Sequence, residues 1–224
     1  MAFFSKMFSK PHHFAGAHEA RSILGEKNVF GPDEWKELFG RKFQVTSIPE
    51  IPWNMDVLKN PGIDQQHFLF LGLDVLGGEP LNIPTWDKLY PGKDKDHQRL
   101  CTLYFRNIPA FYQHTCDLRW YLVVFNLRSS TGDHKKHWGP YDNLIALLPG
   151  GYEVPGMAEL VTGTILYYLL NQEYPDPPEL MVNTSDRAND GNRAILHVTK
   201  RLDMGLNIID NFHLDDANDM ADGL

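Results

Sequence analysis

The sequence predicts an α+β domain in which a small antiparallel sheet is flanked by helices. Two strongly apolar segments, residues 67–76 and 119–127, have the length and the β-branched and aromatic content of strands. Residues 155–170 repeat apolar side chains at three- and four-residue spacing, which is typical of a helix. Short strand-like segments separated by turn residues follow that helix, so strands and helices do not alternate as they do in a parallel α/β fold.

Length and composition indicate a folded chain with one main domain. The chain has 224 residues, of which 42% are hydrophobic and 22% are charged, and this usage excludes wholesale disorder. We expect residues 1–29 to form an N-terminal arm and residues 30–224 to form a single domain. The longest apolar stretch, residues 160–170, is shorter than the roughly 20 residues that span a bilayer. No secretory signal follows Met1, and two cysteines cannot make a disulfide framework, so we expect a cytoplasmic protein without a membrane partner.

The net charge of −8 is concentrated at the C-terminal end. Residues 202–224 contain six Asp and neither Lys nor Arg. Such a segment repels phosphate backbones, which argues against nucleic acid as a partner at this end. At the other end, residues 1–10 interleave Phe and Met with two Lys, a pattern that suits a membrane-surface helix or a packing arm. The short length and small charge favour the arm.

Prolines and glycines mark the elements of the N-terminal half. Residues 17–24 predict a short helix. Residues 32–40 predict another, because a proline opens the first turn, acidic residues lie at its positive end and a glycine suits the C-cap. After the first apolar strand, Gly77-Gly78 suits a tight turn and predicts a hairpin into residues 80–83. We expect a short helix and a loop over residues 84–100.

The C-terminal half begins with the second apolar strand. Its positions are almost all apolar, so both of its faces should be covered and it should lie in the middle of the sheet. The 155–170 helix should present one apolar stripe, made of Met157, Leu160, Val161, Ile165, Tyr168 and Leu169. Turn residues then separate short strands at 180–184, 194–199 and 206–209. Beyond residue 210, polar and apolar residues mix without a period.

Four side chains have the chemistry of a zinc site: His97, Cys101, His114 and Cys116. Alternate residues of a strand point to the same side, so His114 and Cys116 could share a face. The spacing lacks the strong Cys-x-x-Cys pair, and we therefore favour two buried, metal-free cysteines. A Cys116–His114 nucleophile pair lacks a third, orienting residue. Gly-rich phosphate loops and a Gly-x-Ser-x-Gly elbow are absent, so we assign no catalytic residue, metal or cofactor.

Several short motifs resemble, in their shared order, those of an uncharacterised bacterial family. In chain order they are His67–Leu71, Gly77–Leu81, Trp120–Val124, Tyr152–Pro155 with a helix ending Ile165–Tyr168, Asn183–Asp186, Asp190–Arg193 and Met204–Asn207. The likeness covers residues 30–224. The end of this family is similar to that of C-type-lectin-like proteins, and more narrowly to the target proteins of diversity-generating retroelements.

The resemblance implies a C-type-lectin-like scaffold that displays a variable C-terminal stretch and binds an unknown protein or surface ligand. That stretch maps to residues 207–219. The implied ligand-binding residues are Asn207, Ile209, Asn211, Phe212, His213, Asp215, Asp216, Asn218 and Asp219. The calcium motif Glu-Pro-Asn followed by Trp-Asn-Asp is absent. The sequence also stops at Leu224, where we expect family members to continue into a closing strand.

Two other functions stay open on the sequence alone. The first is a metal-dependent hydrolase that uses His97, Cys101, His114 and Cys116, and it would require stoichiometric zinc. The second is an interaction protein whose acidic C-terminal patch docks a basic partner, and its binding would weaken as salt is raised.

Overall fold

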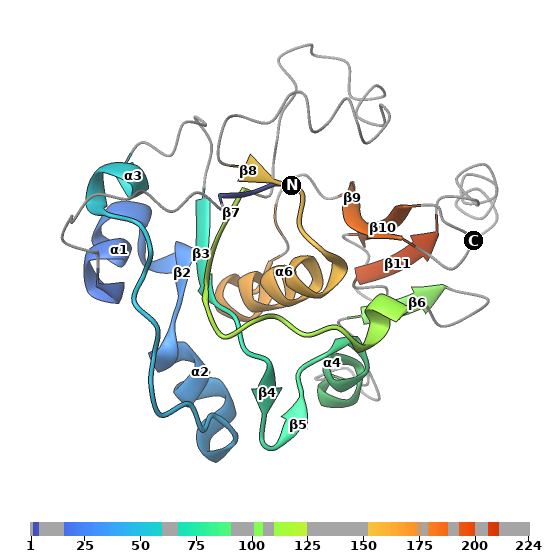
Figure 1. Cartoon of the computed structure of the whole chain (residues 1–224), viewed down its shortest axis with the longest axis horizontal. Helices are drawn as coiled ribbons and strands as arrows, with labels where there is room; N and C mark the ends of the chain where they lie inside the picture. Colours follow the sequence, from blue (N-terminus) through green and yellow to red (C-terminus); the bar gives the residue numbers. More distant parts are fainter. Residues whose placement is uncertain are drawn as a thin grey trace, which may run out of the picture.

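A computed structural model describes ten segments of the chain, and these build two larger sheets with a helix between them and a separate two-stranded hairpin (Figure 1). The described residues are 2–4, 16–59, 67–90, 101–104, 110–124, 152–173, 175, 179–187, 193–199 and 206–210. The predicted α+β class is confirmed. The single antiparallel sheet with helices outside is not, because the strands divide between separate sheets that include two parallel pairs.

The first sheet has the strand order β2-β3-β7-β1-β8. Its strands are β1 (Ala2–Phe4), β2 (Val29–Phe30), β3 (His67–Leu71), β7 (Trp120–Val124) and β8 (Tyr152–Glu153). β2 runs parallel to β3, and the other neighbours are antiparallel. Every residue of β3 and β7 is buried. The prediction that the second apolar strand lies inside the sheet is therefore confirmed.

The second sheet has the order β6-β11-β10-β9. It consists of β6 (Cys101–Tyr104), β9 (Glu179–Arg187), β10 (Arg193–Thr199) and β11 (Leu206–Asp210). β11 pairs with β10 in antiparallel fashion and with β6 in parallel fashion, so it is bonded along both edges. The three strands predicted near the C-terminus are all present, although β9 extends further than the sequence pattern indicated.

Helix α6 (Met157–Asn171) lies between the two sheets, against β2 and β3 on one side and β9 and β10 on the other (Figure 1). All residues from 160 to 166 are buried. The prediction of a single apolar stripe is therefore wrong: a helix covered on two sides has to be apolar around most of its circumference. No helix in the described parts of the chain has both the length and the apolar character needed to cross a membrane.

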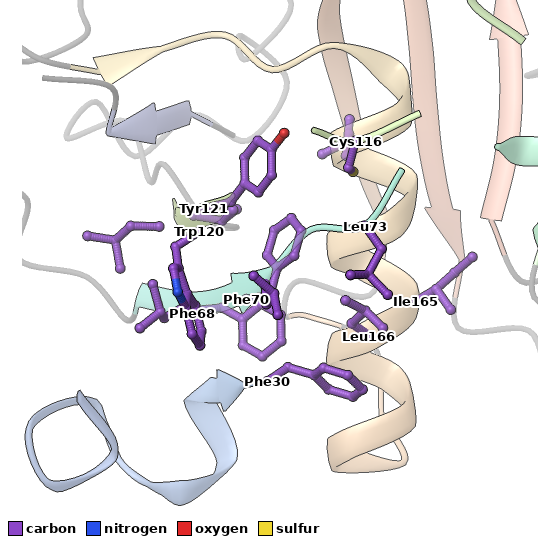
Figure 2. Close-up of a cluster of buried hydrophobic side chains, with 14 of the residues drawn as sticks. Phe30, Phe68, Phe70, Leu73, Cys116, Trp120, Tyr121, Ile165 and Leu166 are labelled. Atoms are coloured by element: carbon purple, nitrogen blue, oxygen red, sulfur yellow. The ribbon is translucent and has the colours of Figure 1, made fainter. Parts of the chain in front are cut away.

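Aromatic side chains fill the space between the first sheet and α6. The rings of Phe70 and Tyr121 stack with centroids 5.0 Å apart (Figure 2). Gly163 lets Phe70 approach the helix, because a Cβ at that position would lie 2.9 Å from Phe70 Cε1. Close packing thus explains a glycine that costs about 1 kcal/mol relative to alanine inside a helix. Ile165 lies on the other side of α6, toward the second sheet (Figure 2).

The helices of the N-terminal part of the chain lie beside the β2 edge of the first sheet. This part contains the helices α1 (Ala17–Leu24), α2 (Pro32–Phe39) and α3 (Met55–Lys59), with short 3-10 turns at Glu26–Asn28 and Gly40–Lys42. The indole of Trp35 in α2 donates to the carbonyl oxygen of Leu71 over 2.9 Å. Ala20 and Val29 belong to the same core cluster as β3 and β7. Segments of the expected N-terminal arm therefore share the sheet and core of the remaining chain.

The connection after β3 contains the predicted turn. Gly77 and Gly78 have φ angles of 64° and 87°, which glycine adopts without strain, and they join β4 (Val75–Leu76) to β5 (Glu79–Pro80). The predicted strand 67–76 is thus two strands, because β3 ends at Leu71. Helix α4 (Ile83–Leu89) follows, and Asn82 caps it by accepting from the amide of Thr85.

Replacing Ile165 with alanine should destabilise the fold by about 2–5 kcal/mol, because the side chain is fully buried between α6 and the second sheet. Chemical denaturation measures this change. Leu38→Ala is the control, since Leu38 is 47% exposed and should change the free energy of unfolding by no more than about 0.5 kcal/mol. A loss below about 1 kcal/mol for Ile165→Ala would contradict the central position of α6.

Candidate functional site

The predicted ligand-binding stretch begins on β11. Asn207 is paired with His197 and Thr102, and Ile209 is paired with Ile195 and Tyr104. The other predicted ligand-binding residues lie outside the described residues; they are Asn211, Phe212, His213, Asp215, Asp216, Asn218 and Asp219. The stretch therefore starts on a strand that is held along both edges.

The candidate zinc ligands do not form a group in the described parts of the chain. His114 and Cys116 follow a 3-10 turn at Ala110–Gln113 and lie in an irregular segment, so the prediction that they share a strand face is wrong. The His114 side chain is 57% exposed, whereas Cys116 is fully buried. His97 lies outside the described residues, and Cys101 is described only by its place in β6. Among the described side chains, no group of three or more His, Cys, Asp or Glu could hold a metal ion, and we identify none of the four as a ligand.

A cluster of charged side chains surrounds the N-terminal end of α6. We call it the α6 junction and define it as His114, Asp117, Arg119, Glu159 and Asp186. The first three come from the irregular segment, Glu159 lies in the first turn of α6, and Asp186 comes from β9. Asp186 Oδ2 accepts a 2.6 Å hydrogen bond from the amide of the first helical residue, and its Oδ1 lies 3.7 Å from His114 Nδ1. The junction therefore links three parts of the fold.

An irregularity in β9 brings Asp186 to the helix. Arg193 of β10 lies opposite Arg187, but Ile195 lies opposite Asn183, so residues 184–186 face a single residue of β10. Extra residues of this kind bend a strand and redirect its side chains. Within the irregularity, the amide of Ser185 donates to the carbonyl oxygen of Pro155 over 2.8 Å. β9 is therefore fastened to the start of α6 by one backbone and one side-chain hydrogen bond.

Two carboxylates meet beside Gly156, the N-cap of α6. A Cβ on this glycine would lie 2.5 Å from Glu159 Oε2 and 3.1 Å from Asp186 Oδ2, so both oxygens lie close to the space that a larger residue would fill. Burial raises the pKa of Glu159, and the charges of Asp186 and Asp117 raise it further, while a bond to its own backbone and the charge of Arg119 lower it. Glu159 therefore holds a proton more readily than an exposed glutamate does.

The thiol of Cys116, which lies near the α6 junction, is poorly suited to act as a nucleophile. Burial raises the pKa of Cys116, and the charge of Glu159 raises it further. Its Sγ donates to the carbonyl oxygen of Ala158 over 3.7 Å. Because the thiolate is the reactive form, this arrangement gives no support to Cys116 as a nucleophile. Beside it, the Arg119 guanidinium lies 4.7 Å from the centroid of the Tyr121 ring, whose hydroxyl accepts from the amide of Asp117.

Sequence reasoning did not find the junction, although one half of it has a sequence signal. Glu159 completes a Gly-x-x-Glu pattern at the start of α6. The same pattern starts α1 and α2, where Glu19 and Glu34 accept hydrogen bonds from the amides of Gly16 and Gly31 over 2.8 and 2.6 Å. No sequence pattern near Asp186 indicates that it accepts from the amide of Met157, because its position depends on how β9 pairs with β10.

Replacing Asp186 with alanine should lower stability by about 0.5–2 kcal/mol, because an amide at the start of a largely buried helix loses its acceptor. Chemical denaturation of the full chain measures the loss. Asp74→Ala removes an exposed carboxylate from a turn and should have almost no effect. Equal effects of the two substitutions would show that Asp186 does not hold the helix.

Cys116 should resist thiol reagents as long as the protein is folded, because its side chain has no exposed surface and its thiol stays protonated. Timed alkylation followed by peptide mass spectrometry measures the rate. We expect modification of Cys116 to follow global unfolding as denaturant is added. Rapid labelling under native conditions would disprove the burial of this side chain.

Comparison with known proteins gives no relative from which a role could be transferred. No family model, curated protein or solved structure matches this chain.

Proposed function

We propose that this chain is a binding module in which an α+β scaffold, C-type-lectin-like in kind, presents residues 207–222 to a protein or surface ligand. One observation carries the proposal: β11 is an interior strand, paired over Leu206–Ile209 with β6 and over Leu206–Asp210 with β10. Its sheet also packs against a buried helix. A segment that leaves such a strand starts from a fixed point, which lowers the entropy lost on binding.

The composition of the displayed segment suits recognition. Residues 207–222 are rich in Asn and Asp, with one His and one Phe, and they offer adaptable hydrogen bonds and some aromatic area. Asp is the only charged residue type in this segment. A ligand surface with Lys or Arg side chains would complement it, whereas nucleic acid would be repelled.

The narrower proposal is that the segment is a variable region of a diversity-generating retroelement. It rests on the family resemblance and on the abrupt change of composition after residue 205. The neighbouring DNA tests it directly. A reverse transcriptase gene and a near-identical template repeat of the 207–222 coding sequence are expected beside the gene. If neither is present, the segment is a fixed binding surface.

Substituting alanine for Asn211, His213, Asp216, Asn218 and Asp219 together should weaken ligand binding strongly and leave the fold intact. Peptides selected on the immobilised wild-type chain from a random display library serve as the probe. We expect these peptides to carry basic and aromatic residues and to lose at least about tenfold in affinity for the variant, which is roughly 1.4 kcal/mol. Thermal unfolding should move by only a few degrees, since the substitutions avoid the described core.

A matched control replaces five exposed residues of the N-terminal part, again one His and two acids among them: His18, Glu37, Gln44, Ser47 and Glu50. It should bind the selected peptides as the wild type does. Peptides that bind all three proteins equally would refute the displayed surface. Affinity that disappears in high salt for every selected peptide would instead favour the simpler acidic patch.

A further inference from the structure

The α6 junction holds the only charged side chain of α6, Glu159, at the point where the second sheet is fastened to that helix. Residues 160–166 of α6 are buried, and the helix lies against both sheets. At the junction, β9 is attached by the Asp186 side chain and by the Ser185 amide. A change in the charge of Glu159 therefore acts on the two hydrogen bonds that attach β9 to the start of α6.

The geometry sets two carboxylates against each other. Asp186 Oδ2 bonds the amide of Met157, and the same oxygen shares the space beside Gly156 with Glu159 Oε2. When Glu159 is neutral, one negative charge faces the helix end. When Glu159 is ionised, a second negative charge enters a partly buried space and repels the group that holds β9.

The other groups around Glu159 do not remove this conflict. From the irregular segment, Asp117 adds a further negative charge and Arg119 supplies a positive one. The Arg119 guanidinium also lies against the Tyr121 ring, and its Nε is 3.8 Å from Asp117 Oδ2. Its positive charge therefore interacts with Asp117 and Tyr121 as well as with Glu159. Tyr121 and Cys116 are neutral neighbours, since burial raises the pKa of each. From β9, Asp186 faces both Glu159 and His114.

We infer that Glu159 is a proton-controlled clamp, which holds β9 and its sheet firmly against α6 when it is protonated and loosens them when it is ionised. The inference stands on the junction alone and does not depend on the proposed binding role.

The direction of the pH effect follows from the burial of Glu159. A carboxyl group whose pKa is higher in the folded chain than in the unfolded chain binds more protons when folded. Its contribution to stability is complete below the ordinary glutamate pKa of about 4.3 and is lost as the pH rises through the folded value. The clamp therefore loosens as the solution goes from acidic toward neutral.

Hydrogen exchange of the full chain tests the clamp at the two amides that cross the junction, those of Met157 and Ser185. Protection factors are corrected for the intrinsic pH dependence of exchange. In the wild type we expect protection at both amides to fall by about threefold or more from mildly acidic to neutral pH. Glu159→Gln keeps the shape without the charge, so its protection should stay high and flat. Glu37→Gln, on the exposed side of α2, should keep the wild-type profile.

Two outcomes would overturn the inference. The first is an unchanged pH profile in Glu159→Gln. The second is lower protection in Glu159→Gln at every pH, which would show that the negative charge stabilises the helix end. Amides of β7 in the first sheet report global unfolding, so the fall in protection at Met157 and Ser185 should exceed any change measured at β7.

Discussion

The enclosure of α6 between two sheets is the constraint on which the rest of this structure depends. A helix with only one covered side can place polar residues on the other, but α6 has no such side over residues 160–166. Its two buried threonines are therefore bonded within the core: Thr164 donates to the carbonyl oxygen of Leu160, and Thr162 accepts from the Trp86 indole. Gly163 completes the fit by admitting Phe70.

The same enclosure explains the charged junction. The first amides of any helix lack partners within the helix, and near a buried end they need acceptors from elsewhere in the protein. A negative group is favoured there, because the helix dipole places partial positive charge at that end. Asp186 meets the need only because β9 carries extra residues opposite β10. Glu159 lies in the same space, so its ionisation would set a second negative charge against the carboxylate that holds the helix end.

Residues that act within one turn of the chain correctly predicted the short helix and the tight turn. The pairing of strands that are far apart in the sequence leaves no such local pattern, and the sequence did not predict it. The proline and acids at the start of α2 act within one turn, and the turn at Gly77-Gly78 needs only two residues that tolerate positive φ. Burial of β7 followed from its continuous apolar run. By contrast, the parallel pairing of β6 with β11 joins residues about a hundred positions apart, which periodicity cannot detect. The prediction for His114 and Cys116 failed because it assumed a strand at that position.

The strand register places the end of β11 and the irregularity in β9 at the same end of the second sheet. Asp210, the last residue of β11, pairs with Ala194, and the neighbouring Arg193 pairs with Arg187. The irregularity that carries Asp186 therefore lies at the same end, two strands away. β9 is hydrogen-bonded to β10, and β10 to β11, so the three strands form one continuous ladder. Because Asp186 holds β9 to α6 and the ladder continues from β9 to β11, the α6 junction and the start of the predicted ligand-binding stretch belong to one hydrogen-bonded unit.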